Sequence, residues 1–275
     1  MEPAAPVSEA VVSRCSAAWR EGRAHAGLEA NLRRAGIPEE AFWQRYISWV
    51  SSMQGDYPGV LLERVMRHAR PGDAVLDIGA GAGLFALPLS RVVRTVTAVE
   101  PSPAQAKQLR AAIRREGTGN ITVVEQRWED IEPGYLGEYD LVLAIHSLQM
   151  DDMGTALRTM CRVAERCLLL IHPKGNQLSE VVRDLFGIEP APDYSGLCQM
   201  LTALGYPSEV EMVDYSYAVL LEQQLEILRY NPGLDAGQRQ ALRDYVVSHG
   251  MTTQLDGGEW LRRSYTDALI SVTCD

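Results

Sequence analysis

The sequence predicts an α/β protein whose mostly parallel sheet carries helices on both faces. From residue 74 onward, short apolar runs alternate with stretches of helical periodicity, which is typical of parallel strands joined by helices. The run from Asp140 to Ile145 is almost entirely apolar, as a strand covered on both faces should be. The 275 residues are 46% hydrophobic, which is enough for one large domain with additions.

The first seventy residues are predicted to be helical and to form an N-terminal cap at 1–70. The expected helices cover residues 8–20, 28–35, 38–52 and 60–69. In the third helix, four side chains recur at helical spacing on one face: Phe42, Tyr46, Trp49 and Met53. Packing of this face against the sheet is the first interpretation. The alternative is a helix that closes over a bound ligand, with Trp43, Arg45 or Tyr46 near it.

Seven strands are expected in the rest of the chain, at residues 74–78, 95–99, 121–124, 140–145, 167–171, 209–217 and 265–273. Helices are expected between these strands, at residues 84–92, 102–116, 154–165, 178–186 and 194–204. The second of these helices has Ser102 as its N-cap and Pro103 at its first position, where both residue types are favoured.

About fifty residues separate the last two strands, many more than a hairpin requires. Helices are expected there over residues 218–230 and 235–248, within an insertion at about 218–260. The sheet needs neither this insertion nor the N-terminal cap. Together they are the predicted lid and substrate pocket.

The charge balance disfavours nucleic acid as a partner. Lys and Arg number 26 against 36 Asp and Glu, a net charge of −10, whereas a duplex or RNA normally requires a basic face. No apolar run is long enough to cross a membrane, and the N-terminus lacks the apolar core of a signal peptide. The five cysteines show no C-x-x-C spacing, which indicates reduced thiols and no metal site. A cytoplasmic protein is expected.

One motif carries most of the functional information. The strand at 74–78 contains Asp77 and is followed by three glycines on alternate positions, Gly79, Gly81 and Gly83, while Glu100 ends the next strand. Glycines let the backbone approach a ligand closely, and the following helix offers unpaired N–H groups. An acid at the end of the second strand can accept both hydroxyls of a ribose. The unit therefore predicts a nucleoside-containing cofactor.

Two cofactors compete for this unit. Gly81-x-Gly83-x-x-Ala86 with Glu100 satisfies the dinucleotide fingerprint, so NAD is one candidate. A dinucleotide loop must receive a pyrophosphate, which Asp77 would repel. S-adenosylmethionine has no phosphate and carries an ammonium group and a sulfonium, so an acid near the loop favours it.

The full pattern Asp77-x-Gly79-x-Gly81-x-Gly83 resembles the first motif of class I S-adenosylmethionine-dependent methyltransferases. The similarity covers roughly residues 69–173. It implies a doubly wound, Rossmann-like sheet of seven strands, mostly parallel, with the last two strands at an antiparallel edge. It also implies that residues 71–275 form the cofactor-binding domain that contains the insertion.

The resemblance implies roles for several residues. Asp77 is expected near the amino group of the cofactor, directly or through water, and the three glycines near its methionyl and ribose parts. Glu100 is expected to hold the ribose hydroxyls, and Pro101 and Ser102 to flank the adenine. The family often has an acid beside the adenine where this chain has Arg127.

The residues after Arg127 are the expected substitutes for that acid. Trp128 is expected to contact the ring edge through its backbone, and Glu129 to act as acceptor, with Asp130 as an alternative. Packing of Trp128 on the sheet edge and capping of a turn by Asp130 are the structural alternatives.

His146 follows the fourth strand, at the edge of the sheet where the transferable methyl group lies in this family. No Asn-Pro-Pro-Tyr-like sequence occurs there, which disfavours methylation of adenine or glutamine nitrogen. An imidazole can take a proton from an oxygen or nitrogen nucleophile. His146 is therefore a candidate catalytic base, or alternatively a cofactor-binding residue. His172 is expected to be structural, and Asp151 and Asp152 to begin a helix.

These inferences predict transfer of a methyl group from S-adenosyl-L-methionine to a small molecule. The expected partners are a small-molecule substrate, with no nucleic acid and no membrane; a homodimer stays open. One alternative is an NAD-dependent oxidoreductase. Others are a protein or RNA methyltransferase and a non-catalytic, cofactor-binding protein of the same fold.

Overall fold

The computed structural model describes residues 8–135, 137–189 and 192–274. Its centre is a parallel sheet of five strands: β2 (Ala74–Ile78), β3 (Thr95–Val99), β4 (Ile121–Val124), β5 (Tyr139–Ile145) and β6 (Ala164–Asn176). β7 (Ser208–Leu220) and β9 (Gly258–Thr273) continue the sheet beyond β6, and β9 pairs antiparallel to both neighbours. The order is β1-β7-β9-β6-β5-β2-β3-β4. The predicted fold class is confirmed.

Two short strands extend the seven predicted ones within the described residues. β1 (Gln54–Gly55) pairs with β7, and β8 (Thr252–Leu255) pairs with β9. The β8–β9 hairpin turns at Asp256 and Gly257, which have φ of 49° and 76°. Two residues of positive φ form the turn whose twist matches that of paired strands.

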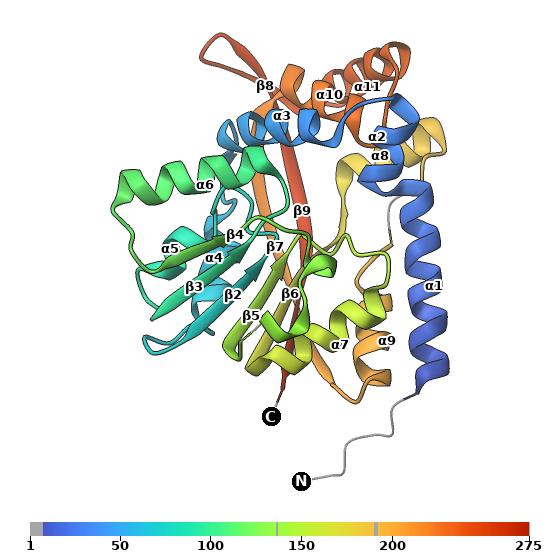
Figure 1. The fold of residues 1–275 in the computed structure, drawn as a ribbon. Helices are drawn as coiled ribbons and strands as arrows, with labels where there is room; N and C mark the ends of the chain where they lie inside the picture. The colour runs from blue at the N-terminus through green and yellow to red at the C-terminus, as the bar shows by residue number, and fades with distance from the viewer. Residues whose placement is uncertain (1–7, 136, 190–191, 275) are drawn as a thin grey trace.

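Helices cover both faces of the sheet (Figure 1). One face carries α1 (Glu9–Ala26), α7 (Met153–Val163) and α9 (Ser195–Ala203). The other carries α4 (Gly59–Met66), α5 (Ala86–Ser90), α6 (Pro103–Glu116) and α8 (Gln177–Phe186). Successive residues of the central strands alternate between the two cores. For example, Val142 and Ala144 of β5 belong to the first, and Leu141 and Leu143 to the second.

Two pairs of helices lie across the end of the sheet at which the parallel strands finish (Figure 1). The N-terminal pair is α2 (Leu28–Ala35) and α3 (Glu39–Ser51), and the pair between β7 and β8 is α10 (Leu221–Tyr230) and α11 (Ala236–Ser248). Two 3₁₀ turns, Trp128–Asp130 and Pro133–Tyr135, follow β4. These segments position the site described below.

Several predicted boundaries hold and several do not. β3 and β4 have their predicted limits, and Ser102 caps α6 by accepting from the Gln105 N–H at 3.3 Å. The prediction of a helix from residue 218 is wrong, because residues 218–220 continue β7 and pair with residues 260–262 of β9. β6 likewise runs on to Asn176 because β9 pairs with it that far.

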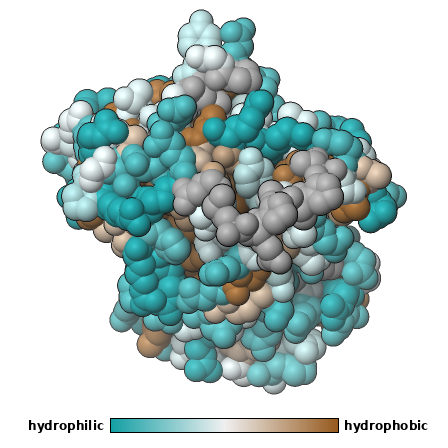
Figure 2. Space-filling model, turned by 90° about the horizontal axis from the view of Figure 1, so that it is seen from below, coloured by the Kyte–Doolittle hydropathy of each residue, from teal (hydrophilic) through white to brown (hydrophobic). Residues whose placement is uncertain are grey.

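No helix within the described residues combines the length and the apolarity that a membrane span requires. On the face that Figure 2 shows, hydrophilic residues predominate and hydrophobic ones are scattered among them.

Candidate active site

The glycines after β2 adopt a backbone conformation that residues with side chains rarely take. Gly79, Gly81 and Gly83 have φ of 76°, 58° and 93°, in the left-handed region. A Cβ atom on Gly79 would lie 2.3 Å from the Cβ of Ser147, and one on Gly83 would lie 2.5 Å from Cδ1 of Leu109. The loop is therefore packed tightly between the segment after β5 and helix α6. Its three glycines present backbone atoms, without side chains, to the cavity.

Glu100 holds this loop from the end of β3. Its Oε2 accepts a hydrogen bond from the Gly81 N–H at 2.8 Å, and its Oε1 accepts from the Ser102 N–H at 2.7 Å. Burial raises the pKa of Glu100, and these two hydrogen bonds oppose the rise. Each carboxylate oxygen can accept a further hydrogen bond, so the side chain can still receive a pair of hydroxyls.

Asp77 is buried without a partner. The side chain is 3% exposed, and Oδ2 makes no hydrogen bond within the described residues. Burial, followed by the nearby Glu100, raises the pKa of Asp77 from 3.8 to about 7. A buried oxygen without a donor is uncommon and calls for a donor or cation from a ligand or water. The residue suits a cationic ligand.

A cavity of about 650 Å³ opens beside the loop. Its wall includes nearly all of the predicted cofactor-binding residues: Gly79, Gly81, Gly83, Glu100, Pro101, Trp128, Glu129 and His146. Ser102, expected to flank the adenine, does not form part of this wall, and neither does Asp77. A bridging water is a route by which its carboxyl group can reach a ligand.

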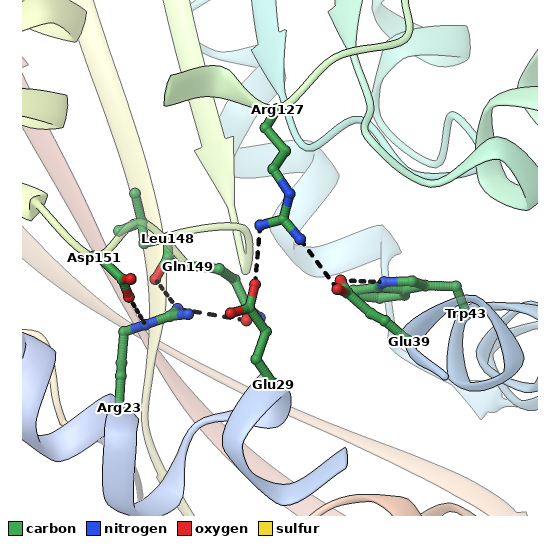
Figure 3. Close-up of polar contacts among 8 residues, drawn as sticks. All are labelled: Arg23, Glu29, Glu39, Trp43, Arg127, Leu148, Gln149 and Asp151. Carbon is green, nitrogen blue, oxygen red and sulfur yellow. Dashed lines mark hydrogen bonds and ion pairs between the residues drawn. The ribbon is translucent and has the colours of Figure 1, made fainter. Parts of the chain in front are cut away.

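Helices α2 and α3 form a roof over this cavity, defined here as residues 28–51, and Arg127 joins the roof to the core (Figure 3). Arg127 donates to Glu29 of α2 at 2.9 Å and to Glu39 of α3 at 3.2 Å. The Glu29 carboxylate raises the pKa of Arg127. This explains the departure from the family pattern: the side chain at this position binds the roof.

A second set of contacts joins the roof to helix α6. The Glu40 carboxylate accepts from the Ser102 hydroxyl at 2.9 Å and from the Ala104 N–H at 2.7 Å. A carboxylate at a helix N-terminus is favourable because the unpaired N–H groups there carry positive charge. The roof is thus connected to the core beside Pro101, where adenine is expected.

The aromatic face of α3 is divided between the core and the cavity wall. Trp49 is buried in the core, Trp43 and Tyr46 lie on the cavity wall, and Phe42 is both buried and on that wall. Arg45, proposed as a ligand neighbour, is exposed and is not part of that wall. The expectation for Arg45 is therefore wrong, because the helix turns it toward solvent.

His146 comes directly after β5 in an unusual conformation, with φ of 54°. Its Nε2 lies 2.8 Å from Oδ2 of Asp267, and the same oxygen accepts a hydrogen bond from the Tyr215 hydroxyl at 2.9 Å. Neither contact was expected from the sequence: Asp267 lies on β9 and Tyr215 on β7. An acid within the otherwise apolar end of the last strand was the available signal.

The other residues singled out in the sequence lie in the core, on the surface or at a helix cap. Trp128 is buried among core side chains, so its packing role is present together with its place on the cavity wall. Asp130 is exposed and off the wall. Asp152 caps α7 by accepting from the Thr155 N–H at 3.0 Å, as expected. His172 is half-buried and its ring contacts the Pro192 carbonyl at 2.9 Å.

Comparison with known proteins agrees with this geometry. Residues 75–166 match the family model described as a methyltransferase domain. A curated relative, ribosomal RNA small subunit methyltransferase G of Mycolicibacterium smegmatis, is 32% identical over 157 residues, which are 55% of this chain and 61% of the relative. The chain spans less than two thirds of the length of the first curated relatives that it matches.

Solved structures share the fold. A candidate methyltransferase from Bacillus halodurans C-125 superposes with a TM-score of 0.58 at 18% identity, covering 78% of this chain and 98% of that one. Magnesium protoporphyrin IX methyltransferase from Synechocystis PCC 6803, solved with bound SAH, gives a TM-score of 0.50 at 15% identity, covering 85% and 84%. The resemblance to class I methyltransferases is thereby confirmed, and residues 75–166 carry the match to the methyltransferase domain.

Proposed function

We propose that this protein binds S-adenosyl-L-methionine and transfers its methyl group to a small-molecule acceptor. The observation that carries the proposal is the buried, unpartnered carboxyl group of Asp77 beside a bare glycine loop that Glu100 holds. A diphosphate would meet two carboxyl groups there, whereas an ammonium group would be attracted. This favours S-adenosylmethionine over NAD.

The described residues fit that cofactor. Glu100 would accept the ribose hydroxyls, and Asp77 would face the amino group through a water molecule. Pro101 and Trp128 would border the adenine, with Glu129 available to its exocyclic amine. The bound sulfonium supplies an activated methyl group. The protein's own contribution is to align the acceptor and to exclude water, which the roof and the aromatic wall can do.

The proposal of a small acceptor rests on the roof. Residues 28–51 lie over the cavity and are joined to the core by Arg127 and Glu40. On the other side, Asn231 after α10 is on the wall and accepts from the Asn31 amide at 2.6 Å. We infer that the cap at 1–70 and the insertion at about 218–260 enclose the acceptor within the domain at 71–275. This arrangement favours a small acceptor over a polymer.

Calorimetry tests the proposal. S-adenosylmethionine and S-adenosylhomocysteine should bind and NAD should not. Glu100→Ala should weaken binding by about 2–3 kcal/mol, because a buried charge-assisted hydrogen-bond pair is lost. Glu63→Ala removes an exposed acid on α4 and serves as the matched control, with affinity unchanged. Tight binding of NAD alone would overturn the proposal.

Catalysis requires a separate measurement. Incubation with methyl-labelled cofactor and a fractionated cell extract should move label into a small-molecule fraction. Label in RNA or protein would replace the small-molecule acceptor with a polymer. Binding without any movement of label would favour the non-catalytic alternative.

A further inference from the structure

Asp267 is an acid placed inside the sheet. It lies on β9 with 0% of its surface exposed. Its Oδ2 lies 2.8 Å from Nε2 of His146 and accepts a hydrogen bond from the Tyr215 hydroxyl at 2.9 Å. Its Oδ1 has no hydrogen-bond partner within the described residues. The residue directly after β5 and a tyrosine of β7 therefore meet at one carboxylate group of β9. If Asp267 only supported the fold, it would not need a partner that lies on the cavity wall, as His146 does.

The contact with Asp267 decides which ring nitrogen of His146 is available. Nε2 is directed at the carboxylate, and Nδ1 makes no hydrogen bond among the described residues. A carboxylate holds the proton on the nitrogen that it faces, which leaves the lone pair on the other. His146 is on the cavity wall and its side chain is 22% exposed, so Nδ1 is free to meet a ligand.

Aromatic rings surround this part of the cavity. The ring of Tyr57 is nearly parallel to that of His146, at 20° and 6.4 Å between centroids, and both are on the wall. Tyr46 and Trp43 of α3 continue the wall. Faces of this kind bind flat rings by stacking. The space next to His146 thus suits a planar molecule.

The other titratable groups that face Asp267 and His146 are Tyr46, Tyr57, Tyr215, Tyr265 and His172. Burial raises the pKa of Tyr57 and Tyr215 and raises that of Tyr46 to about 12, with Asp267 adding to each rise. Burial also lowers the pKa of His172. The directions of these pKa shifts keep Tyr46, Tyr57, Tyr215 and His172 neutral near neutral pH, so none of these four side chains competes with His146 for a proton of the ligand.

We propose that the acceptor is a planar small molecule with an acidic hydroxyl group, a phenol or an enol, and that Asp267 and Tyr215 are positioning residues that make His146 its base. The inference rests on the proposed methyl transfer. A neutral amine attacks with a free lone pair and can release its proton afterwards. A hydroxyl oxygen is a weak nucleophile until its proton leaves. A base already positioned in the site therefore favours an oxygen acceptor over a nitrogen acceptor.

The hydroxyl proton passes to Nδ1 of His146, and Asp267 stabilises the resulting imidazolium. A lone pair of the acceptor oxygen forms the bond to the methyl carbon. The carbon–sulfur bond breaks, and its electron pair stays on sulfur as the neutral thioether. The imidazolium then releases its proton to water.

A phenol that changes colour on ionisation tests the base without turnover. The probe is 4-nitrophenol, bound to the protein saturated with S-adenosylhomocysteine, and the absorbance of the phenolate is followed against pH. When bound to the wild-type protein, the probe should ionise at a lower pH than it does free in water. His146→Gln and Asp267→Asn should remove this shift, and Tyr215→Phe should reduce it. Tyr217→Phe, a neighbouring buried tyrosine without a bond to Asp267, should leave it unchanged.

Turnover gives an independent readout. With methyl-labelled cofactor and a panel of catechols, hydroxybenzoates and anilines, the phenols should accept label. His146→Gln should lower kcat/KM about 100-fold, and Asp267→Asn about 10- to 100-fold, with the alkaline side of the pH profile least affected. Affinity for S-adenosylhomocysteine should be unchanged in Tyr215→Phe.

The two proposals fail differently. If the wild-type protein does not bind S-adenosylhomocysteine, the proposed function fails. If it binds and 4-nitrophenol stays protonated, or only anilines are methylated, the assignment of acceptor and base is wrong. Should Asp267→Asn not fold, Tyr215→Phe decides: an unchanged ionisation shift and pH profile would overturn the positioning role.

Discussion

Two aspartates, one just before β2 and one near its end, show how context decides what a buried acid does. Asp73 is ion-paired with Arg166 and accepts the Arg70 N–H at 2.8 Å. Asp77, four residues on, is equally buried and has an oxygen without a donor. Buried acids that are paired support the fold, whereas unpaired ones oppose it. Asp77 therefore costs stability, which is expected of a residue kept for a ligand.

The sign of the pH effect follows from the direction of the shift. The folded pKa of Asp77 is about 7, above the 3.8 of an ordinary aspartate. Between these values the folded state holds a proton that the unfolded state releases, so this group lowers stability as pH rises from about 4 to 7. The ionised form binds a cationic ligand, so affinity should rise as pH increases from 5 to 7.

Asp77→Asn should therefore raise the free energy of unfolding at pH 8 by about 1–3 kcal/mol while weakening S-adenosylmethionine binding. Asp73→Asn is the matched control with the opposite sign, because it leaves Arg166 half-buried without its partner. Urea denaturation at pH 5 and pH 8 measures the first effect, and calorimetry the second. A loss of stability in Asp77→Asn at pH 8 would contradict the assignment.

At the scale of elements, the loop between β2 and α5 is restricted by its neighbours as well as by its own backbone. Gly79 and Gly117 share a left-handed conformation, with φ of 76° and 66°. A Cβ on Gly79 would overlap Ser147, whereas one on Gly117 would meet nothing within 4 Å. A side chain at Gly117 would therefore meet backbone strain alone, whereas one at Gly79 would meet backbone strain and a steric clash.

Gly117→Ala should lower stability by about 1 kcal/mol, the cost of a side chain in the left-handed region. Gly79→Ala should lower it by about 2–4 kcal/mol and should also weaken cofactor binding, because Ser147 and the loop must move apart. Thermal unfolding and calorimetry on both variants measure the difference. Equal losses of stability in the two variants would mean that the loop can move away from Ser147 at little cost.

At the scale of the whole molecule, the cofactor should hold the roof and the core together. Ligand at 100 times its dissociation constant stabilises a folded protein by about 2.7 kcal/mol. For a chain of this size, S-adenosylhomocysteine should raise the melting temperature by about 5–10 °C. Amide exchange should slow in residues 28–51 at the same time. NAD should change neither measurement; a shift with NAD alone would reverse the choice of cofactor.

Local pattern accounts for what could be predicted from the sequence. Asp77, the three glycines and Glu100 follow one another within a single β-loop-α-β unit, and the limits of β3 and β4 follow from short apolar runs. Boundaries that depend on pairing were wrong: residues 218–220 have helical periodicity but join β9, because a long partner strand overrides local preference.

The sequence by itself determined the fold class and the loop that receives the cofactor, because both depend on residues adjacent in the chain. Only the tertiary structure decided what stands around the cavity. Arg127 reaches Glu29 across 98 residues and Glu39 across 88, and His146 reaches Asp267 across 121. No spacing rule links such positions, since the order of strands in the sheet and the placing of α2 and α3 bring them together.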